Sequence, residues 1–345
     1  MIVEELNPRA HAEWDAYVDA SPLGNCYHLT AWGTVASRAY GHRAPYLVAR
    51  EHAGGPIRGG LPLLIIQSPI GRYVTNAMFG GYCPVLAETP EVRRALLDGA
   101  LDLVRRVRAS RFTFKAIHEA ECPPGFARQD LGGVATLSLE GGPDELWKRF
   151  RNKTRNAIRK AQKSDLEVRA GAEELPRFYD VLAQNYHRKG TPIYGVAIMR
   201  ELCAALPTST EIVTLWKDGQ AISGALVLYH KDVVYVPFCS SRAEHFNLNP
   251  NNLIYWEIMR RASARGMKTL DFGRSPIGSS SMAFKLGWGA VETPQPHFTY
   301  RADGKQPSAI QADDPWARRA IELWQRLPRK VADRLGPWVH GSFFV

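Results

Sequence analysis

The sequence predicts an α/β protein built from two tandem units of similar size. One observation behind this prediction is the length of 345 residues, because a single hydrophobic core seldom keeps growing beyond about 250–300 residues. The other is a repeated order of elements. In each half, a strand–turn–strand hairpin precedes a helix that leads into a buried strand.

The hairpin occupies residues 55–65 in the first half and residues 220–230 in the second. Each stretch enters an apolar strand through a turn, and an alignment of the two matches Gly59 with Gly224. Their separation of roughly 160 residues indicates duplication of a domain-sized unit, since solenoid repeats have periods of about 20–50 residues. Chance similarity between two short hairpins is the alternative.

A helix and a buried strand follow each hairpin. We expect them at residues 92–109 and 111–116 in the first half, and at 252–265 and 267–272 in the second. The segment 122–143 is rich in Gly and Pro and joins the halves. This predicts units at residues 1–140 and 141–302, followed by a basic amphipathic tail at 303–345.

The composition is that of a folded protein with an anionic partner. Apolar residues make up 45% of the chain and charged residues 23%, which is ordinary for a globular protein. The net charge of +10 favours a nucleotide, a phosphorylated carrier, tRNA or an acidic membrane surface. No apolar run is long enough to span a bilayer, and residues 1–8 lack the features of a secretory signal. We therefore expect a cytoplasmic protein.

The five cysteines form no pattern with chemical meaning. They are odd in number, widely scattered, and lack a CxxC pair or a histidine at metal-ligand spacing. We expect no disulfide, no metal and no tightly bound cofactor.

A single basic helix is predicted to begin at Asp144 and to run to Lys163. One stripe at helical spacing packs inward and comprises Trp147, Phe150, Thr154, Ala157, Ile158 and Ala161. The adjoining stripe is cationic and comprises Arg151, Arg155, Arg159 and Lys163. Eight basic and no acidic residues lie between Lys148 and Lys163, so like charges repel along the helix. We expect either an anionic ligand or a solvated helix whose charges pair with acids elsewhere.

The second half continues through helices at 176–187 and 195–205, the hairpin, a strand at 232–239, a helix from Asn251, a strand at 268–272 and a short helix with Lys285. This order, together with four stretches, resembles the FemAB-like group of GNAT acyltransferases. The stretches are WKRFRNKTRNAIRKA from Trp147, GQAISGAL from Gly219, NNLIYWE from Asn251, and DFGRS from Asp271 followed by FKLGWG from Phe284. The match covers most of residues 140–300. It is most similar to FemAB-like proteins that accompany bacterial exopolysaccharide and protein-sorting systems.

The resemblance implies two GNAT-like units, with mixed central sheets flanked by helices and a cleft between the units. It also implies transfer of an acyl or aminoacyl group to an amine of a cell-envelope or polysaccharide precursor. Lys285 corresponds to the lysine of the family's Phe-Lys motif. A non-catalytic protein that holds a phosphorylated carrier is the alternative.

The chain departs from ordinary GNAT enzymes at residues 247–252. Asn247-Leu-Asn-Pro-Asn-Asn stands there in place of the loop that wraps the pyrophosphate of acetyl-CoA. This departure weakens acyl-CoA as the donor and favours aminoacyl-tRNA, as does the basic helix. Both donors stay open, and so does a nucleoside-diphosphate or lipid-phosphate acceptor for the basic groove.

Acyl transfer to an amine needs a proton acceptor and donors aimed at the oxygen that becomes negative. For the proton acceptor we favour Asp271, and its alternative role is a strand-end carboxylate bound to backbone amides. His187 is a second candidate, although a lone loop histidine is more often a surface residue. We expect Tyr235, Ser240 and Trp256 to line the acceptor cleft, with core packing as the alternative.

For the negative oxygen or a donor phosphate we favour Lys285. We expect Arg274 and the start of the short helix, at Ser279 and Ser280, to help Lys285 bind this oxygen or phosphate. The alternative is a Ser-rich turn that only caps the helix.

The tail alternates cationic and apolar side chains, which is typical of a helix that docks on an anionic membrane surface. Its alternative role is packing across the two units. The residues concerned are Arg318, Arg319, Arg326, Arg329, Lys330 and Arg334, with Trp316, Leu323, Trp324 and Trp338.

Overall fold

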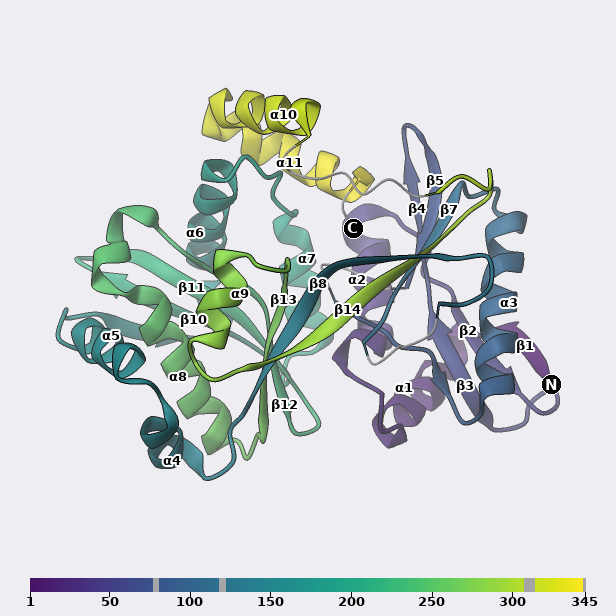
Figure 1. The fold of residues 1–345 in the computed structure, drawn as a ribbon, viewed down its shortest axis with the longest axis horizontal. Coiled ribbons are helices and arrows are strands. Elements are labelled where there is room, and N and C mark those ends of the chain that lie inside the picture. The colour runs from purple at the N-terminus through teal and green to yellow at the C-terminus, as the bar shows by residue number, and fades with distance from the viewer. Residues whose placement is uncertain (77–80, 118–121, 307–313, 344–345) are drawn as a thin grey trace. The chain divides into compact units, whose positions relative to one another are not determined.

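The computed structural model describes residues 1–76, 81–117, 122–306 and 314–343. The chain divides into two compact units (Figure 1). The first comprises Met1–Gly133, Pro294–Ala309 and Gly341–Val345, and the second comprises Val134–Thr293 and Ile310–His340. This division differs from the predicted one, because the chain returns to the first unit after completing most of the second.

In its described residues, the first unit contains two groups of strands and three α-helices. One group has the order β1 (Ile2–Glu5), β2 (Tyr46–Arg50), β3 (Ile57–Pro62) and β6 (Leu86–Ala87). The other has the order β4 (Leu64–Ser68), β5 (Gly71–Thr75), β7 (Arg111–Lys115) and β14 (Val291–Arg301). The helices are α1 (His11–Ala20), α2 (Thr30–Tyr40) and α3 (Pro90–Arg106), with short 3-10 turns at Pro8–Ala10 and Cys26–His28.

The second unit is built on a sheet with the order β13 (Thr269–Ser275), β12 (Val233–Ser241), β11 (Gln220–His230), β10 (Thr210–Lys217) and β9 (Glu167–Ala170). The strand β8 (Ala127–Ser138) begins in the first unit and ends in the second, next to β13. The helices are α4 (Gly142–Arg149), α5 (Asn152–Gln162), α6 (Leu175–Arg188), α7 (Val196–Ala205), α8 (Pro250–Ala264), α9 (Ser280–Leu286), α10 (Pro315–Arg326) and α11 (Arg329–Phe343), with 3-10 turns at Ala172–Glu174 and Ala243–Leu248.

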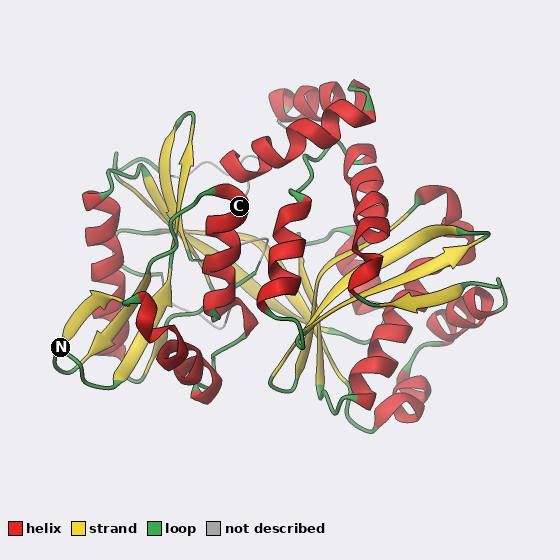
Figure 2. Ribbon diagram, turned by 180° about the vertical axis from the view of Figure 1, so that it is seen from behind, coloured by secondary structure: helices red, strands yellow, loops and turns green. Residues whose placement is uncertain are grey.

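Helices cover both faces of this sheet (Figure 2). The successive residues Gly224 and Ala225 of β11 show why, since neighbouring strand residues point to opposite faces. A side chain at Gly224 would meet Phe178 of α6, whereas Ala225 belongs to the core that includes Ile258 of α8. Among the described residues, no helix is both long enough and apolar enough to cross a membrane.

The predicted mixed α/β architecture of repeated units is confirmed. In each unit an antiparallel hairpin is followed by a helix that connects two parallel strands. These are β2–β3 with α3 between β5 and β7 in the first unit, and β10–β11 with α8 between β12 and β13 in the second.

The hairpin alignment is displaced by one residue from the predicted one. Each hairpin has a bulge at which one residue has no partner, Arg58 in β3 and Ile222 in β11. Counting from the bulges matches Gly60, not Gly59, with Gly224. Both of these glycines lie under an aromatic ring: a Cβ would be 2.0 Å from Trp14 at Gly60 and 2.6 Å from Phe178 at Gly224.

The prediction of one continuous basic helix is wrong, because the chain forms α4 and α5 with a break at Phe150. Phe150 has an extended backbone with φ −69° and ψ 142°. Its ring packs edge-on against Trp256 and Trp288, with centroids 5.8 and 5.0 Å away. Burial of this ring fixes the break, which helical periodicity alone could not reveal.

Candidate active site

The candidate site lies where two parallel strands of the second unit stop pairing (Figure 1). The ladder between β12 and β13 ends at Tyr235 and Asp271. Beyond this point β12 continues to Ser241 and β13 to Ser275. In these described residues the two strands do not pair with each other. Backbone groups of β13 beyond Asp271 are therefore available to side chains or to a ligand.

Asp271 binds one of these backbone groups. Its side chain is 1% exposed, and Oδ1 accepts a hydrogen bond of 2.6 Å from the backbone N–H of Gly273. Gly273 has φ +74°, a left-handed conformation that glycine adopts readily. This contact matches the carboxylate–amide alternative for Asp271, so proton acceptance by Asp271 stays a prediction.

Lys285 binds the next backbone groups from α9. Its side chain is buried, and Nζ donates to the carbonyl oxygens of Gly273 at 2.7 Å and Arg274 at 3.2 Å. An ammonium group has three N–H donors, and these carbonyls account for two. Burial lowers the pKa of Lys285 to about 8; the nearby Asp271 and Cys239 oppose this shift, and Arg274 adds to it. The lysine thus neither points to bulk solvent nor forms a simple surface ion pair.

Cys239 and Lys189 extend this cluster, and sequence reasoning missed both as site residues. Burial raises the pKa of Cys239 to about 12, while Tyr255, Lys285 and Lys189 partly oppose the shift. The thiol is therefore protonated at neutral pH, which argues against a thiolate nucleophile. Desolvation lowers the pKa of Lys189, at the end of α6, and the charge of Arg188 adds to this effect.

The α9 start is built by its serines. Ser279 Oγ accepts from the backbone N–H of Met282 at 3.2 Å and donates to Pro276 O at 2.7 Å, so Ser279 caps the helix. Ser280 is the exposed first residue of α9. Arg274 is half-buried, and burial lowers its pKa. The contacts of Ser279 are those of the capping alternative.

The three predicted cleft residues are buried. Trp256 is 7% exposed and packs on Trp147 and Phe150, which commits its ring to the core and corrects its assignment to a cleft. Tyr235 is 4% exposed and is paired in register with Asp271. Ser240 Oγ accepts a 2.7 Å hydrogen bond from Asn185, which ties β12 to α6.

His187 binds the C-terminal helices. Its Nε2 lies 2.9 Å from the carbonyl oxygen of Leu327, in the turn between α10 and α11. The tautomer with a proton on Nε2 donates to this oxygen. This contact gives His187 a structural partner and does not bring it to Asp271 or Lys285.

The four residues of the predicted cationic stripe lie on α5 and at its two ends, with Arg151 just before the helix and Lys163 just after it. Arg151, Arg159 and Lys163 are exposed and Arg155 is half-buried. Arg155 and Arg159 donate to the amide oxygens of nearby asparagines, and Arg159 also lies over the ring of Trp147. In the described part of the chain none of the four forms an ion pair. Arg159, Lys160 and Lys163 line an open depression with Asn156 and Ser164.

The start of α8 offers limited support for a phosphate. Asn249 has φ 56°, and Pro250 is the first helical residue. Proline has no N–H, so one first-turn donor of an anion site is missing. Asn251 is engaged too, because its side-chain oxygen accepts from Ser241 at 2.7 Å. Among the described residues, no group of three or more His, Cys, Asp or Glu side chains could hold a metal ion.

Comparison with known families and structures identifies the fold. Residues 148–286 match the acetyltransferase (GNAT) domain family, and no curated protein matches the chain. FemX is similar in structure, with a TM-score of 0.67 and 16% identity over 94% of this chain and 100% of FemX.

Two further solved structures span nearly the whole chain. L-PGS from Bacillus licheniformis has a TM-score of 0.56 and 12% identity over 95% of this chain and 98% of its own. A tandem GNAT protein from the clavulanic acid biosynthesis pathway has a TM-score of 0.56 and 14% identity over 89% of this chain and 99% of its own. Residues 148–286 therefore match the acetyltransferase (GNAT) domain family, and the chain as a whole has the fold of FemX and of the tandem GNAT protein.

Proposed function

We propose that the protein is an N-acyltransferase or aminoacyltransferase that acts at the end of the β12–β13 ladder. The observation that carries the proposal is Lys285, a buried ammonium group held on two backbone carbonyls with one N–H donor left over. A preorganised cation in a site that excludes water stabilises negative charge far more than one in bulk solvent.

The proposed reaction joins an amine to an activated carbonyl carbon. As the neutral amine attacks, the carbonyl oxygen becomes negative and accepts a hydrogen bond from the third N–H of Lys285. Collapse of this intermediate forms the amide and breaks the ester bond to tRNA, or the thioester bond to CoA. The departing hydroxyl or thiol takes up the proton that the amine loses. Asp271 supports the charge on Lys285, since its carboxylate raises the pKa that burial lowers. In this proposal Asp271 positions and charges Lys285, and acceptance of the amine's proton by Asp271 is the alternative that the pH profile of Asp271→Asn separates.

The proposed acceptor is an anionic precursor of the cell envelope or of a polysaccharide. The cations of α5 support this, because they repel one another and form no ion pair within the described residues. Phosphate groups bind clustered arginines by charge and by bidentate hydrogen bonds. Arg151, Arg155, Arg159 and Lys163 are the residues that we propose hold the phosphate.

The proposed donor is an aminoacyl-tRNA, with acyl-CoA as the second candidate. The missing first-turn N–H at Pro250 and the engaged Asn251 argue against a tight pyrophosphate site at α8. The cations of α5 suit an RNA backbone as well as a precursor phosphate. Both donors occur in the cytoplasm, and we place the reaction there.

The test is a transfer assay with the purified full chain. One arm supplies labelled aminoacyl-tRNA, and the other supplies acetyl-CoA with detection of the released thiol. Both arms contain a nucleotide-linked acceptor with a free amine, and mass spectrometry identifies the acylated product. Lys285→Ala should reduce turnover by about 10²–10³, the usual cost of removing an oxyanion donor.

Lys268→Ala is the matched control, because Lys268 lies just before β13 with its side chain 66% exposed. It should leave turnover within about twofold of wild type, as for a surface change. A folded Lys285→Ala protein with the wild-type rate contradicts the proposed role of Lys285. Saturable binding of the acceptor with no product from either donor supports instead a non-catalytic carrier-binding protein.

A further inference from the structure

Helices α10 and α11 turn an apolar face outward. Five large hydrophobic side chains on this face are well exposed; they are Trp316 (57%), Leu323 (64%), Val331 (41%), Leu335 (44%) and Trp338 (60%). An outward face with this much apolar surface is unusual, because a surface helix normally turns its apolar side to the core.

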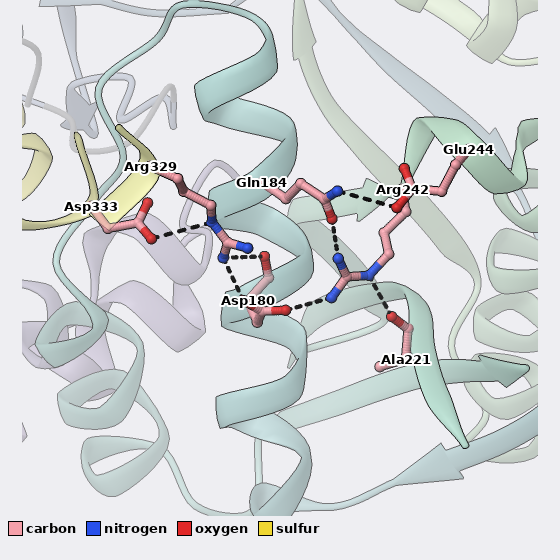
Figure 3. Close-up of polar contacts among 7 residues, drawn as sticks. All are labelled: Asp180, Gln184, Ala221, Arg242, Glu244, Arg329 and Asp333. Carbon is pink, nitrogen blue, oxygen red and sulfur yellow. Dashed lines mark hydrogen bonds and ion pairs between the residues drawn. The ribbon is translucent and has the colours of Figure 1, made fainter. Parts of the chain in front are cut away.

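The opposite face of the helix pair is fixed to the second unit. Arg329 at the start of α11 binds Asp180 of α6, and Asp180 also binds Arg242 at the end of β12 (Figure 3). Farther along α11, Gly336 lies so close to Ile193 that a Cβ would be 2.9 Å from its backbone N. The ring of His340 packs against that of Tyr194, with centroids 3.8 Å apart and the ring planes tilted by 40°. These contacts determine which side of α11 points outward.

The outward side of α11 is both apolar and cationic. Ala332, Gly336 and His340 are buried and recur every fourth residue, so they form the inner stripe. Val331, Leu335 and Trp338 follow at helical spacing on the other side. Lys330 and Arg334, both exposed, lie directly beside them at the same spacing.

α10 repeats this arrangement. Trp316 and Leu323 are separated by seven residues, which places them on one side of the helix. Arg319 and Arg326, also seven residues apart and exposed, form the neighbouring stripe. The inner side is held by Ile321 and Gln325, since Gln325 donates to Arg188 O at 2.8 Å and a Cβ at Gly190 would meet Ile321.

We propose that this surface docks on an anionic lipid bilayer. The surface, called here the α10–α11 face, consists of Trp316, Leu323, Val331, Leu335 and Trp338 with Arg319, Arg326, Lys330 and Arg334. Tryptophan prefers the interface between headgroups and acyl chains, aliphatic side chains enter the acyl region, and cations bind anionic headgroups. On each of the two helices, the apolar and cationic side chains lie next to each other on the side away from the inner stripe.

The composition of the face favours lipid over other anionic or apolar partners. A nucleic acid would use the cations and the tryptophans, but it gains little from exposed Leu323, Val331 and Leu335. A protein partner would need acidic side chains opposite the Arg and Lys residues and, beside them, an apolar surface for the exposed hydrophobic side chains. A second copy of the chain would instead bring the same cations to the contact, and like charges repel. The face therefore has charge complementarity to an anionic membrane surface.

The test is co-sedimentation of the full chain with vesicles. One set is pure phosphatidylcholine and the other is an equal mixture of phosphatidylglycerol and phosphatidylcholine. Wild type should sediment with the mixed vesicles and at least tenfold less with the neutral ones. Two variants divide the face: Leu323→Gln with Leu335→Gln removes apolar contacts, and Arg326→Gln with Lys330→Gln and Arg334→Gln removes charge. Each should weaken binding at least tenfold, and added salt should weaken wild type far more than the charge variant.

The matched control is Arg94→Gln with Arg106→Gln and Arg108→Gln, three exposed cations in and just after α3, which removes the same charge elsewhere. It should bind mixed vesicles like wild type, and all variants should keep the wild-type thermal unfolding curve. Binding lost equally in the α3 control overturns the proposal, because net charge would then explain it. Wild-type binding in the apolar variant also overturns it. So does a face variant that still binds vesicles but loses tRNA binding or self-association. None of these readouts depends on catalytic activity.

Discussion

At Lys285, burial and charge act against each other, and this gives the proposed chemistry a pH signature. If the ammonium form stabilises the oxyanion, turnover should fall as pH rises through about 8, the value to which burial lowers the Lys285 pKa. Lys285→Arg keeps its charge far above this range, so its residual activity should lack this alkaline decline. The measurement is kcat/KM from pH 6 to 10 for both proteins. An identical decline in both would assign it to another group.

The same shift affects stability with a defined sign. Lys285 releases its proton at lower pH in the folded protein than in the unfolded chain, whose lysines titrate near about 10.4. Between these values the unfolded state binds more protons, so the contribution of Lys285 to the free energy of unfolding rises with pH, by about 3 kcal/mol at most. In denaturant unfolding followed from pH 7 to 10.5, the stability of wild type relative to Lys285→Met should therefore rise with pH.

Asp271→Asn separates a positioning role from a base role. Removing the carboxylate removes a charge that raises the Lys285 pKa, so the alkaline decline should move to lower pH. If Asp271 were instead a general base, Asp271→Asn would lower kcat at every pH, and the alkaline decline would stay at the same pH as in wild type. The expected result is a shifted limb, with turnover lowered by about tenfold near neutral pH as the ammonium fraction falls. A pH profile of unchanged shape contradicts it.

Several site residues could be predicted from sequence, and others could not. Lys285 and Asp271 could be nominated from sequence because they occur in two short recognisable stretches, Asp271 at the end of a predicted strand and Lys285 on the short helix that follows. Lys189 and Cys239 were missed because they join the site only where β12 and β13 stop pairing, and local sequence does not encode that point. Trp256 was misassigned because an aromatic residue on a predicted helix does not disclose whether its ring faces a cleft or a core.

Among the elements, the two hairpins give a paired prediction. Gly60→Ala and Gly224→Ala should each destabilise the protein by about 1–3 kcal/mol, because the new Cβ would overlap Trp14 or Phe178. Gly195→Ala is the control, since its nearest contact is an ordinary 3.5 Å to Pro337. Chemical denaturation measures all three. If Gly224→Ala were as stable as wild type, the expectation that Gly60 and Gly224 play equivalent packing roles in the two hairpins would be wrong.

The order of the elements could be predicted from the sequence, but the residue-by-residue pairing of the hairpin strands could not. Apolar alternation located β3 and β11, yet Arg58 and Ile222 bulge out of their ladders, and a bulge shifts every later residue by one position. Near these bulges, Gly60 packs against Trp14 of α1 and Gly224 against Phe178 of α6. The sequence pattern therefore aligned Gly59 where the structure aligns Gly60.

Asp180 on α6 links the C-terminal helices to the end of β12. Burial raises the pKa of Asp180, but hydrogen bonds and charges from Arg329 and Arg242 outweigh this and hold it below the ordinary value. Asp180→Asn should cost about 2 kcal/mol of stability at pH 7, because the Arg242 side chain is 9% exposed and loses its carboxylate partner. Asp218→Asn, at an 85% exposed carboxylate, should cost almost nothing.

Acid should erase this difference. A carboxylate whose pKa is lower in the folded than in the unfolded state stabilises the folded protein at pH values above the unfolded pKa, about 3.9. This stabilisation is lost as the pH falls through the folded pKa. Unfolding curves of wild type and Asp180→Asn should therefore differ most near neutral pH and approach each other toward about pH 3, roughly one unit below the unfolded pKa. A constant difference would mean that Asp180 acts through its shape and not through its charge.

At the scale of the whole molecule, the first unit depends on a strand that the chain supplies last. β14 pairs with β7 from His297–Lys115 to Arg301–Arg111, and the fully buried Phe298 stacks on Phe114 at 5.9 Å. The Gly- and Pro-rich segment 122–143 suggested a boundary near Gly141. Composition marks such a segment, but it cannot show that a distant strand completes the sheet of the first unit.

A fragment of residues 1–140 should therefore fail to unfold cooperatively. It lacks five residues of ladder along β7 and exposes the surface that Phe298 covers, whose burial alone contributes about 2–3 kcal/mol. An open apolar strand edge also promotes aggregation. Joining residues 294–306 to the fragment through a flexible Gly/Ser linker should restore a cooperative thermal transition, because those residues supply the missing edge. Circular dichroism melts of the two fragments make the comparison, and a cooperative transition in the shorter fragment at the same temperature would show that the first unit is complete without β14.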